Sequence, residues 1–171
     1  MTLDRLNALD AETAARDLRR CCGSRAWAAH MAAARPFLSV EALQAAADRI
    51  WSALGESDWR EAFAAHPRIG ERAGPAAGAG TAAWSVREQS SVATAETTVL
   101  DRLAAKNREY EARFGYIFIV CATGKSADQM LTMLERRLRH DAAQEIGVAA
   151  DEQRKITRLR LEKLLAEDEA R

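Results

Sequence analysis

Apolar residues recur every three or four positions along most of this chain, the spacing typical of one buried face of an α-helix. The same stretches are rich in alanine, leucine, arginine and glutamate, and the whole chain has only 3 prolines. The pattern predicts helices over about 3–18, 25–34 and 40–54, over a short stretch containing Trp59 and Phe63, over about 82–113 with a break near Thr94, from 127 onward, and over about 151–166.

Serine residues precede three of these predicted helices. Ser24 and Ser39 are expected N-caps, because a serine hydroxyl can accept a hydrogen bond from a backbone N–H of the first turn. Ser126 and Gln129 have the spacing of a capping box, in which the two residues cap each other's backbone N–H. One apolar face after Ser39 is expected to hold Val40, Leu43, Ala47, Ile50 and Leu54.

Two segments do not fit the helical pattern. Residues 70–80 (GERAGPAAGAG) predict a loop, which is either a flexible connection or a lid. Residues 115–122 (GYIFIVCA) are an unbroken apolar run rich in β-branched and aromatic residues, typical of a buried strand. No second strand is predicted to pair with this run, so its backbone polar groups need other partners, either within the protein and its water or from a ligand.

Composition and charge argue against a nucleic-acid-binding protein, a membrane protein and a disulfide-rich secreted protein. The 171 residues suffice for one domain with a core, and Lys+Arg 25 balance Asp+Glu 25, which argues against a nucleic-acid partner. No apolar run approaches the roughly 20 residues that span a bilayer, and the acidic N-terminal stretch does not resemble a secretory signal, so no membrane partner is expected. With 3 cysteines, of which Cys21 and Cys22 are adjacent, we expect no disulfide framework and a cytoplasmic location.

His66 is the first candidate for chemistry. Pro67 restricts His66 to extended backbone angles, so the helix containing Phe63 is expected to end there. The imidazole then lies at a helix end, where it can act as an acid or base, or can interact with the helix dipole as a C-terminal cap. Spacing alone favours the structural role and does not exclude the chemical one.

Ser85, Glu88 and Gln89 are three and four positions apart and would share one helix face. A hydroxyl, a carboxylate and an amide together can bind a polar ligand with several hydrogen-bonding groups. The commoner meaning of such a pattern is a solvated surface.

Arg160 lies between Ile156 and Leu164 on an apolar stripe of the last predicted helix, whereas Arg158 points away from that stripe. A core-facing arginine needs an anionic partner or a route to water. The guanidinium could pair with a carboxylate of the protein, pair with an anionic group of a ligand, or reach solvent. The position of Arg160 on the stripe is compatible with all three.

Two common sites are not expected. Residues 122–126 (ATGKS) look like the end of a phosphate-binding loop, but the glycine required five residues before Gly124 is replaced by Ile119. The 3 histidines are scattered, with no HxxxH or CxxC pair, so no metal site is predicted. Cys121 is interpreted as a buried small apolar residue.

The ordered set of motifs resembles one family, the 2-oxo-4-hydroxy-4-carboxy-5-ureidoimidazoline (OHCU) decarboxylases of urate breakdown. The specific matches are HPRIG at 66–70, SVREQ at 85–89, FGYIFIV at 114–120 and KITRLRL at 155–161. The resemblance implies an all-α fold, a single domain over 1–171 with the extended segment 115–122 at the active site, no cofactor and no metal, and a homodimer. It implies conversion of OHCU to (S)-allantoin and carbon dioxide in purine catabolism.

The resemblance also assigns residues. His66 would be the catalytic acid or base, completed by Glu88 and Arg160. The substrate would be bound by Pro67, Ser85, Val86, Arg87, Gln89, Phe118, Ile119, Val120, Cys121 and Ala122. Two alternatives remain: a non-catalytic helical interaction domain, and an enzyme of the same fold that acts on another ureide.

Overall fold

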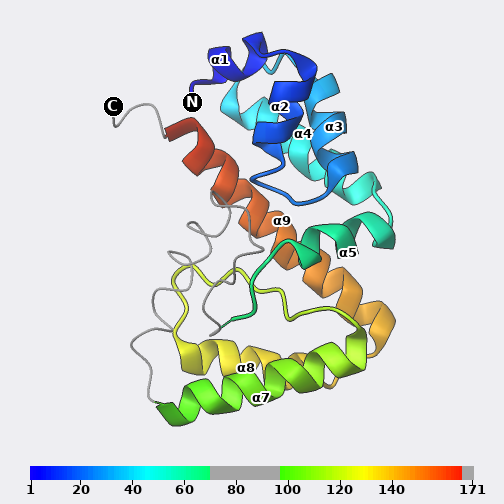
Figure 1. Cartoon of the computed structure of the whole chain (residues 1–171), viewed down its shortest axis with the longest axis vertical. Coiled ribbons are helices and arrows are strands. Elements are labelled where there is room, and N and C mark those ends of the chain that lie inside the picture. Colours follow the sequence, from blue (N-terminus) through cyan, green and yellow to red (C-terminus); the bar gives the residue numbers. More distant parts are fainter. Residues whose placement is uncertain (70–96, 167–171) are drawn as a thin grey trace. The chain divides into compact units, whose positions relative to one another are not determined.

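The computed structural model describes residues 1–69 and 97–166, and these residues form helices and no strand (Figure 1). This confirms the all-α prediction for the described ranges. The helices are α1 (Leu3–Ala8), α2 (Ala11–Leu18), α3 (Arg25–Ala33), α4 (Val40–Ala53), α5 (Glu56–Ala64), α7 (Thr97–Phe114), α8 (Ala127–Arg137) and α9 (Ala142–Ala166). None of the described helices is long and apolar enough to cross a membrane.

The predicted caps are confirmed. Ser24 accepts from the backbone N–H of Trp27 at 3.2 Å, and Ser39 accepts from Ala42 at 3.2 Å. Ser126 and Gln129 form the complete capping box at the start of α8. These caps are local, which is why their spacing in the sequence was sufficient to place three helix starts.

The prediction of one helix over 3–18 was wrong, because the chain leaves the helical conformation at Leu9, where ψ is 150°. Asp10 then caps α2 by accepting from the N–H of Thr13 at 2.8 Å. An aspartate that binds a nearby backbone N–H can interrupt a helix. The spacing of apolar residues continues across this interruption, so it could not predict where α1 ends.

The start of the last helix was also predicted wrongly. Helix α9 begins at Ala142, not near Asp151. Gly147 lies inside it, although an interior glycine costs about 1 kcal/mol relative to alanine. Burial of Glu145, Ala149 and Ala150 in the tertiary structure outweighs that local cost.

The first of two compact units comprises Met1–Ala62 with Arg154–Arg171. Within it, α2 packs against α3, and α3 packs against α4. Trp27 is fully buried and donates its indole N–H to the carbonyl of Ala47 at 3.1 Å, which ties α3 to α4. The buried face of α4 includes Leu43, Ala46, Ala47 and Trp51, whereas Val40, expected on this face, is exposed.

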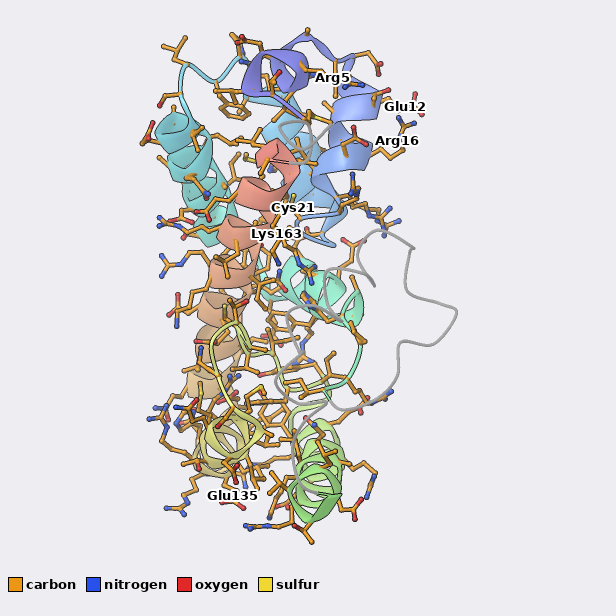
Figure 2. All side chains as sticks on the ribbon, turned by 90° about the vertical axis from the view of Figure 1, so that its left-hand side faces the viewer. Arg5, Glu12, Arg16, Cys21, Glu135 and Lys163 are labelled. Atoms are coloured by element: carbon orange, nitrogen blue, oxygen red, sulfur yellow. The ribbon has the colours of Figure 1, made fainter. Side chains whose placement is uncertain are left out.

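The second unit comprises Phe63–Gln153. Helices α7 and α8 lie side by side in it (Figure 1). Arg102 of α7 is paired at 2.9 Å with Glu135 of α8, which Figure 2 labels. Met130 and Leu134, which share one face of α8, are fully buried. The predicted loop at 70–80 and the first part (82–96) of the helix predicted over 82–113 lie outside the described residues.

Candidate active site

His66 lies just beyond the end of α5, as Pro67 predicted. The helix ends at Ala64, and the backbone N–H of His66 donates to the carbonyl of Phe63 at 3.1 Å. The imidazole is half-buried, and its Nε2 is 2.8 Å from Oε1 of Gln153 on α9. The side chain of Gln153 is fully buried, so the contact holds one edge of the ring inside the second unit.

Residues 115–122 form neither helix nor strand: residues 115 and 116 are bends, and residues 117–122 have no regular secondary structure. The sequence predicted no partner strand for this run, and the described residues contain no strand. Residues 118–122 are all buried, with exposed fractions between 2% and 7%. Side chains supply partners to its backbone: Arg137 donates to the carbonyl of Ile119 at 2.6 Å, and Lys125 donates to the carbonyl of Cys121 at 2.6 Å. The N–H of Cys121 donates to Glu152 at 2.8 Å. Both backbone groups of Cys121 are therefore bound by this protein's own side chains.

A buried ion pair, Arg137 with Glu145, supports this segment through the bond from Arg137 to the carbonyl of Ile119. Arg137 and Glu145 are 2.6 Å apart, and both side chains are 0% exposed. The guanidinium of Arg137 lies 4.6 Å from the ring centre of Phe118, which adds a cation–π contact. Tyr110 donates to the same carboxylate, and burial raises the pKa of Tyr110 well above its ordinary value of 10.0. Because every charge in this cluster has a partner, the cluster can hold the extended segment rigidly.

Two consecutive residues of α9 contact the two described parts of the predicted site, which are His66 and the segment 118–122. Gln153 contacts His66, and Glu152 holds the N–H of Cys121. The sequence pattern predicted a site role for neither residue. A usable signal existed, because Gln153, Thr157 and Arg160 are spaced by four and three positions and so share the helix face already assigned to Arg160.

Arg160 is 1% exposed, which confirms that it lies on a buried stripe. It belongs to the first unit, where its positive charge acts on the buried thiol of Cys22. Burial raises the pKa of Cys22 to about 12, and a hydrogen bond with Thr157 and the charge of Arg160 oppose this rise only in part. Arg158, by contrast, has an exposed side chain paired with Asp48 at 3.1 Å.

The remaining predicted residues lie outside the described part of the chain. These are Ser85, Val86, Arg87, Glu88 and Gln89. Their convergence with His66 and Arg160 therefore stays a prediction. Among the described residues, no group of three or more His, Cys, Asp or Glu side chains is placed to hold a metal ion.

A family model, OHCU decarboxylase, matches residues 7–162. The chain is 40% identical over 148 residues to the uric acid degradation bifunctional protein TTL of Arabidopsis thaliana, and spans 46% of that longer protein. It is 29% identical to the 2-oxo-4-hydroxy-4-carboxy-5-ureidoimidazoline decarboxylase of Haloferax volcanii, covering 94% of each chain. A crystal structure of OHCU decarboxylase in the presence of (S)-allantoin matches with a TM-score of 0.76 and 35% identity, over 93% of this chain and 100% of the other.

The helical fold and these likenesses place the chain among the carboxy-lyases, and specifically among the decarboxylases of urate degradation. The chain belongs to the OHCU decarboxylase family. Membership confirms the resemblance stated from the motifs and argues against a purely non-catalytic interaction domain.

Proposed function

We propose that this protein converts OHCU to (S)-allantoin and carbon dioxide, with His66 moving the proton. The observation that carries the proposal is the anchoring of His66 and of the Cys121 backbone by consecutive side chains of α9, in a chain of the OHCU decarboxylase family. An imidazole held in this way can transfer protons to a small polar ring, and we propose that this ring lies against the buried segment 118–122.

Decarboxylation requires a place for the electron pair left by the departing carbon dioxide. In OHCU the carboxylate lies beside a ring C=N bond, so the substrate supplies its own electron sink. We therefore propose that no added cofactor or metal takes part. The protein must orient the carboxylate, assist proton movement and protonate one face of the ring carbon.

His66 would remove or relay the hydroxyl proton of OHCU and deliver a proton to the ring carbon, since an imidazole titrates near neutral pH. Glu88 would hold the imidazole or a ureido N–H. Arg160 would bind an anionic or carbonyl oxygen other than the departing carboxylate, because tight binding of the ground-state carboxylate would oppose the loss of carbon dioxide.

The substrate's polar edges would be bound by Pro67, by Ser85 to Gln89, and by backbone groups between Phe118 and Ala122. Within that segment, Cys121 already donates to Glu152 and accepts from Lys125. The carbonyls of Ile119 and Ala122 are also bound within the protein, by Arg137 and by the N–H of Lys125. We therefore expect Phe118, Val120 and the N–H groups of Ile119 and Ala122 to contribute more of the hydrogen bonds to substrate than Cys121 does.

The test follows optical activity as freshly generated OHCU decays, because the uncatalysed reaction gives racemic allantoin and the enzyme should give one hand faster. His66→Ala should keep the helical circular dichroism and lose about 100-fold or more in turnover, the lower end of general acid–base effects. His30, an exposed histidine of α3, provides the control variant His30→Ala with unchanged turnover. Near-normal turnover in His66→Ala would remove His66 from the mechanism.

We further propose one OHCU decarboxylase-like domain over 1–171, working as a homodimer in the cytoplasm without a nucleic-acid or membrane partner. The family match over 7–162 includes residues of both compact units, which supports a single domain. The three cysteines are free and buried, which is compatible with a reducing compartment. Light scattering should give twice the mass of one chain.

A further inference from the structure

Gln153 is one of the buried polar residues of the second unit. Its side chain is 0% exposed, although a buried amide must find hydrogen-bond partners to offset the loss of water. One such partner is the imidazole of His66, 87 positions away in the chain, with Oε1 of Gln153 2.8 Å from Nε2 of His66. An apolar side chain would fill the same space on α9 without this requirement, so the amide has a role beyond packing.

We infer that Gln153 is a positioning residue for His66. Its amide oxygen can only accept a hydrogen bond, so the imidazole nitrogen that it contacts must carry a proton. Gln153 therefore holds the neutral ring as the Nε2–H tautomer, with the basic lone pair on Nδ1, and of the two roles proposed for Glu88 this leaves the one on a ureido N–H of the substrate. The inference rests on the proposed function, because it identifies the nitrogen of His66 that takes the proton in that reaction.

Two charged residues near this pair along the chain have partners of their own. Glu152 binds the N–H of Cys121, and Arg68 forms a two-pronged ion pair with Glu111 of α7 at 2.8 and 2.9 Å. A neutral amide at residue 153 orients the ring and, unlike a carboxylate, does not stabilise the imidazolium. An amide at residue 153 is therefore compatible with a histidine that must be neutral to accept a proton.

The first experiment is ¹⁵N NMR of the intact protein, which resolves the imidazole nitrogens of the 3 histidines, with His66 assigned by loss of its signals in His66→Ala. The wild type should show the chemical shifts of the Nε2–H tautomer and an Nε2–H proton that exchanges slowly with water. In Gln153→Leu this proton should exchange too fast to be seen. An unprotonated Nε2 in the wild type, or an Nε2–H signal unchanged in Gln153→Leu, would overturn the inference.

The second experiment uses Gln153→Glu, which keeps the acceptor and the shape but adds a negative charge. A carboxylate at this distance favours the imidazolium, so the pKa of His66 should rise by about one unit or more. The acidic limb of the kcat/KM profile should move to higher pH by the same amount. Gln144→Glu, at an exposed position of the same helix, is the matched control and should leave the profile unchanged.

Gln153→Leu should lower kcat by about 10-fold through loss of ring orientation, and Gln153→Glu should restore much of kcat above the shifted pKa. A purely structural role predicts equal loss in both variants with no shift of the pH profile. The NMR result does not depend on turnover, so a protected Nε2–H in a protein inactive on OHCU would defeat the proposed function alone. Full activity with an unchanged Nε2–H signal in Gln153→Leu would defeat only the inference.

Discussion

Burial determines the chemistry of Cys22 at the scale of a single residue. The thiol is fully buried, and its pKa is raised to about 12 because the thiolate would lose its hydration. The thiolate is the nucleophile, so Cys22 should be inert near neutral pH despite the positive charge of Arg160. The expectation of no disulfide framework agrees with three free, buried thiols.

The raised pKa of Cys22 predicts a loss of stability in alkali. In the unfolded chain the thiol titrates near 9.0, and in the folded chain near 12, so the unfolded state releases its proton first as pH rises. This contribution to stability is fully present below pH 9.0 and is lost as pH rises from there toward 12. Urea unfolding between neutral pH and pH 10.5 measures the slope.

Cys22→Ala and Cys22→Ser should both flatten this slope, by up to about 1.4 kcal/mol per pH unit for one proton. The two variants can differ in absolute stability, because serine buries a hydroxyl, but they should share the same pH dependence. A slope equal to that of the parent in both would show that Cys22 does not ionise differently in the folded and unfolded states.

At the scale of elements, the extended segment 115–122 is held by helices and not by a partner strand. Arg137 of α8 binds the carbonyl of Ile119 and is neutralised by Glu145 of α9, which also accepts from Tyr110 of α7. His140 adds a contact of 2.7 Å to the same carboxylate. One buried ion pair thus connects three helices and the segment that we expect beside the substrate.

Arg137→Met should destabilise the fold by about 3–5 kcal/mol, because it leaves the Glu145 carboxylate buried without its cation. Arg136 is exposed on the same helix, so Arg136→Met is the matched control and should change stability by less than about 0.5 kcal/mol. Urea unfolding at neutral pH compares the two. Similar small effects in both variants would show that Glu145 is neutralised by other means.

At the scale of the whole molecule, α9 contributes to both compact units. Its residues through Gln153 belong to the second unit, and its residues from Arg154 belong to the first. One continuous helix therefore contains residues of both units, and unfolding either unit removes the packing that supports part of that helix.

We expect a single thermal unfolding transition for this reason. Calorimetry should give equal calorimetric and van't Hoff enthalpies, as for one cooperative domain. Two separated heat-absorption peaks, or different midpoints by near-ultraviolet and far-ultraviolet circular dichroism, would contradict the single-domain proposal for 1–171.

The sequence alone determined the features that depend on neighbours along the chain. The helical period, the caps at Ser24, Ser39 and Ser126, the end of α5 before Pro67 and the buried stripe of Arg160 all arise within a few residues. Only the tertiary structure decided which distant groups meet: Gln153 with His66, and Glu152 with the backbone of Cys121. Such pairs depend on how helices pack, which the local period cannot encode because it fixes the buried face and not its partner.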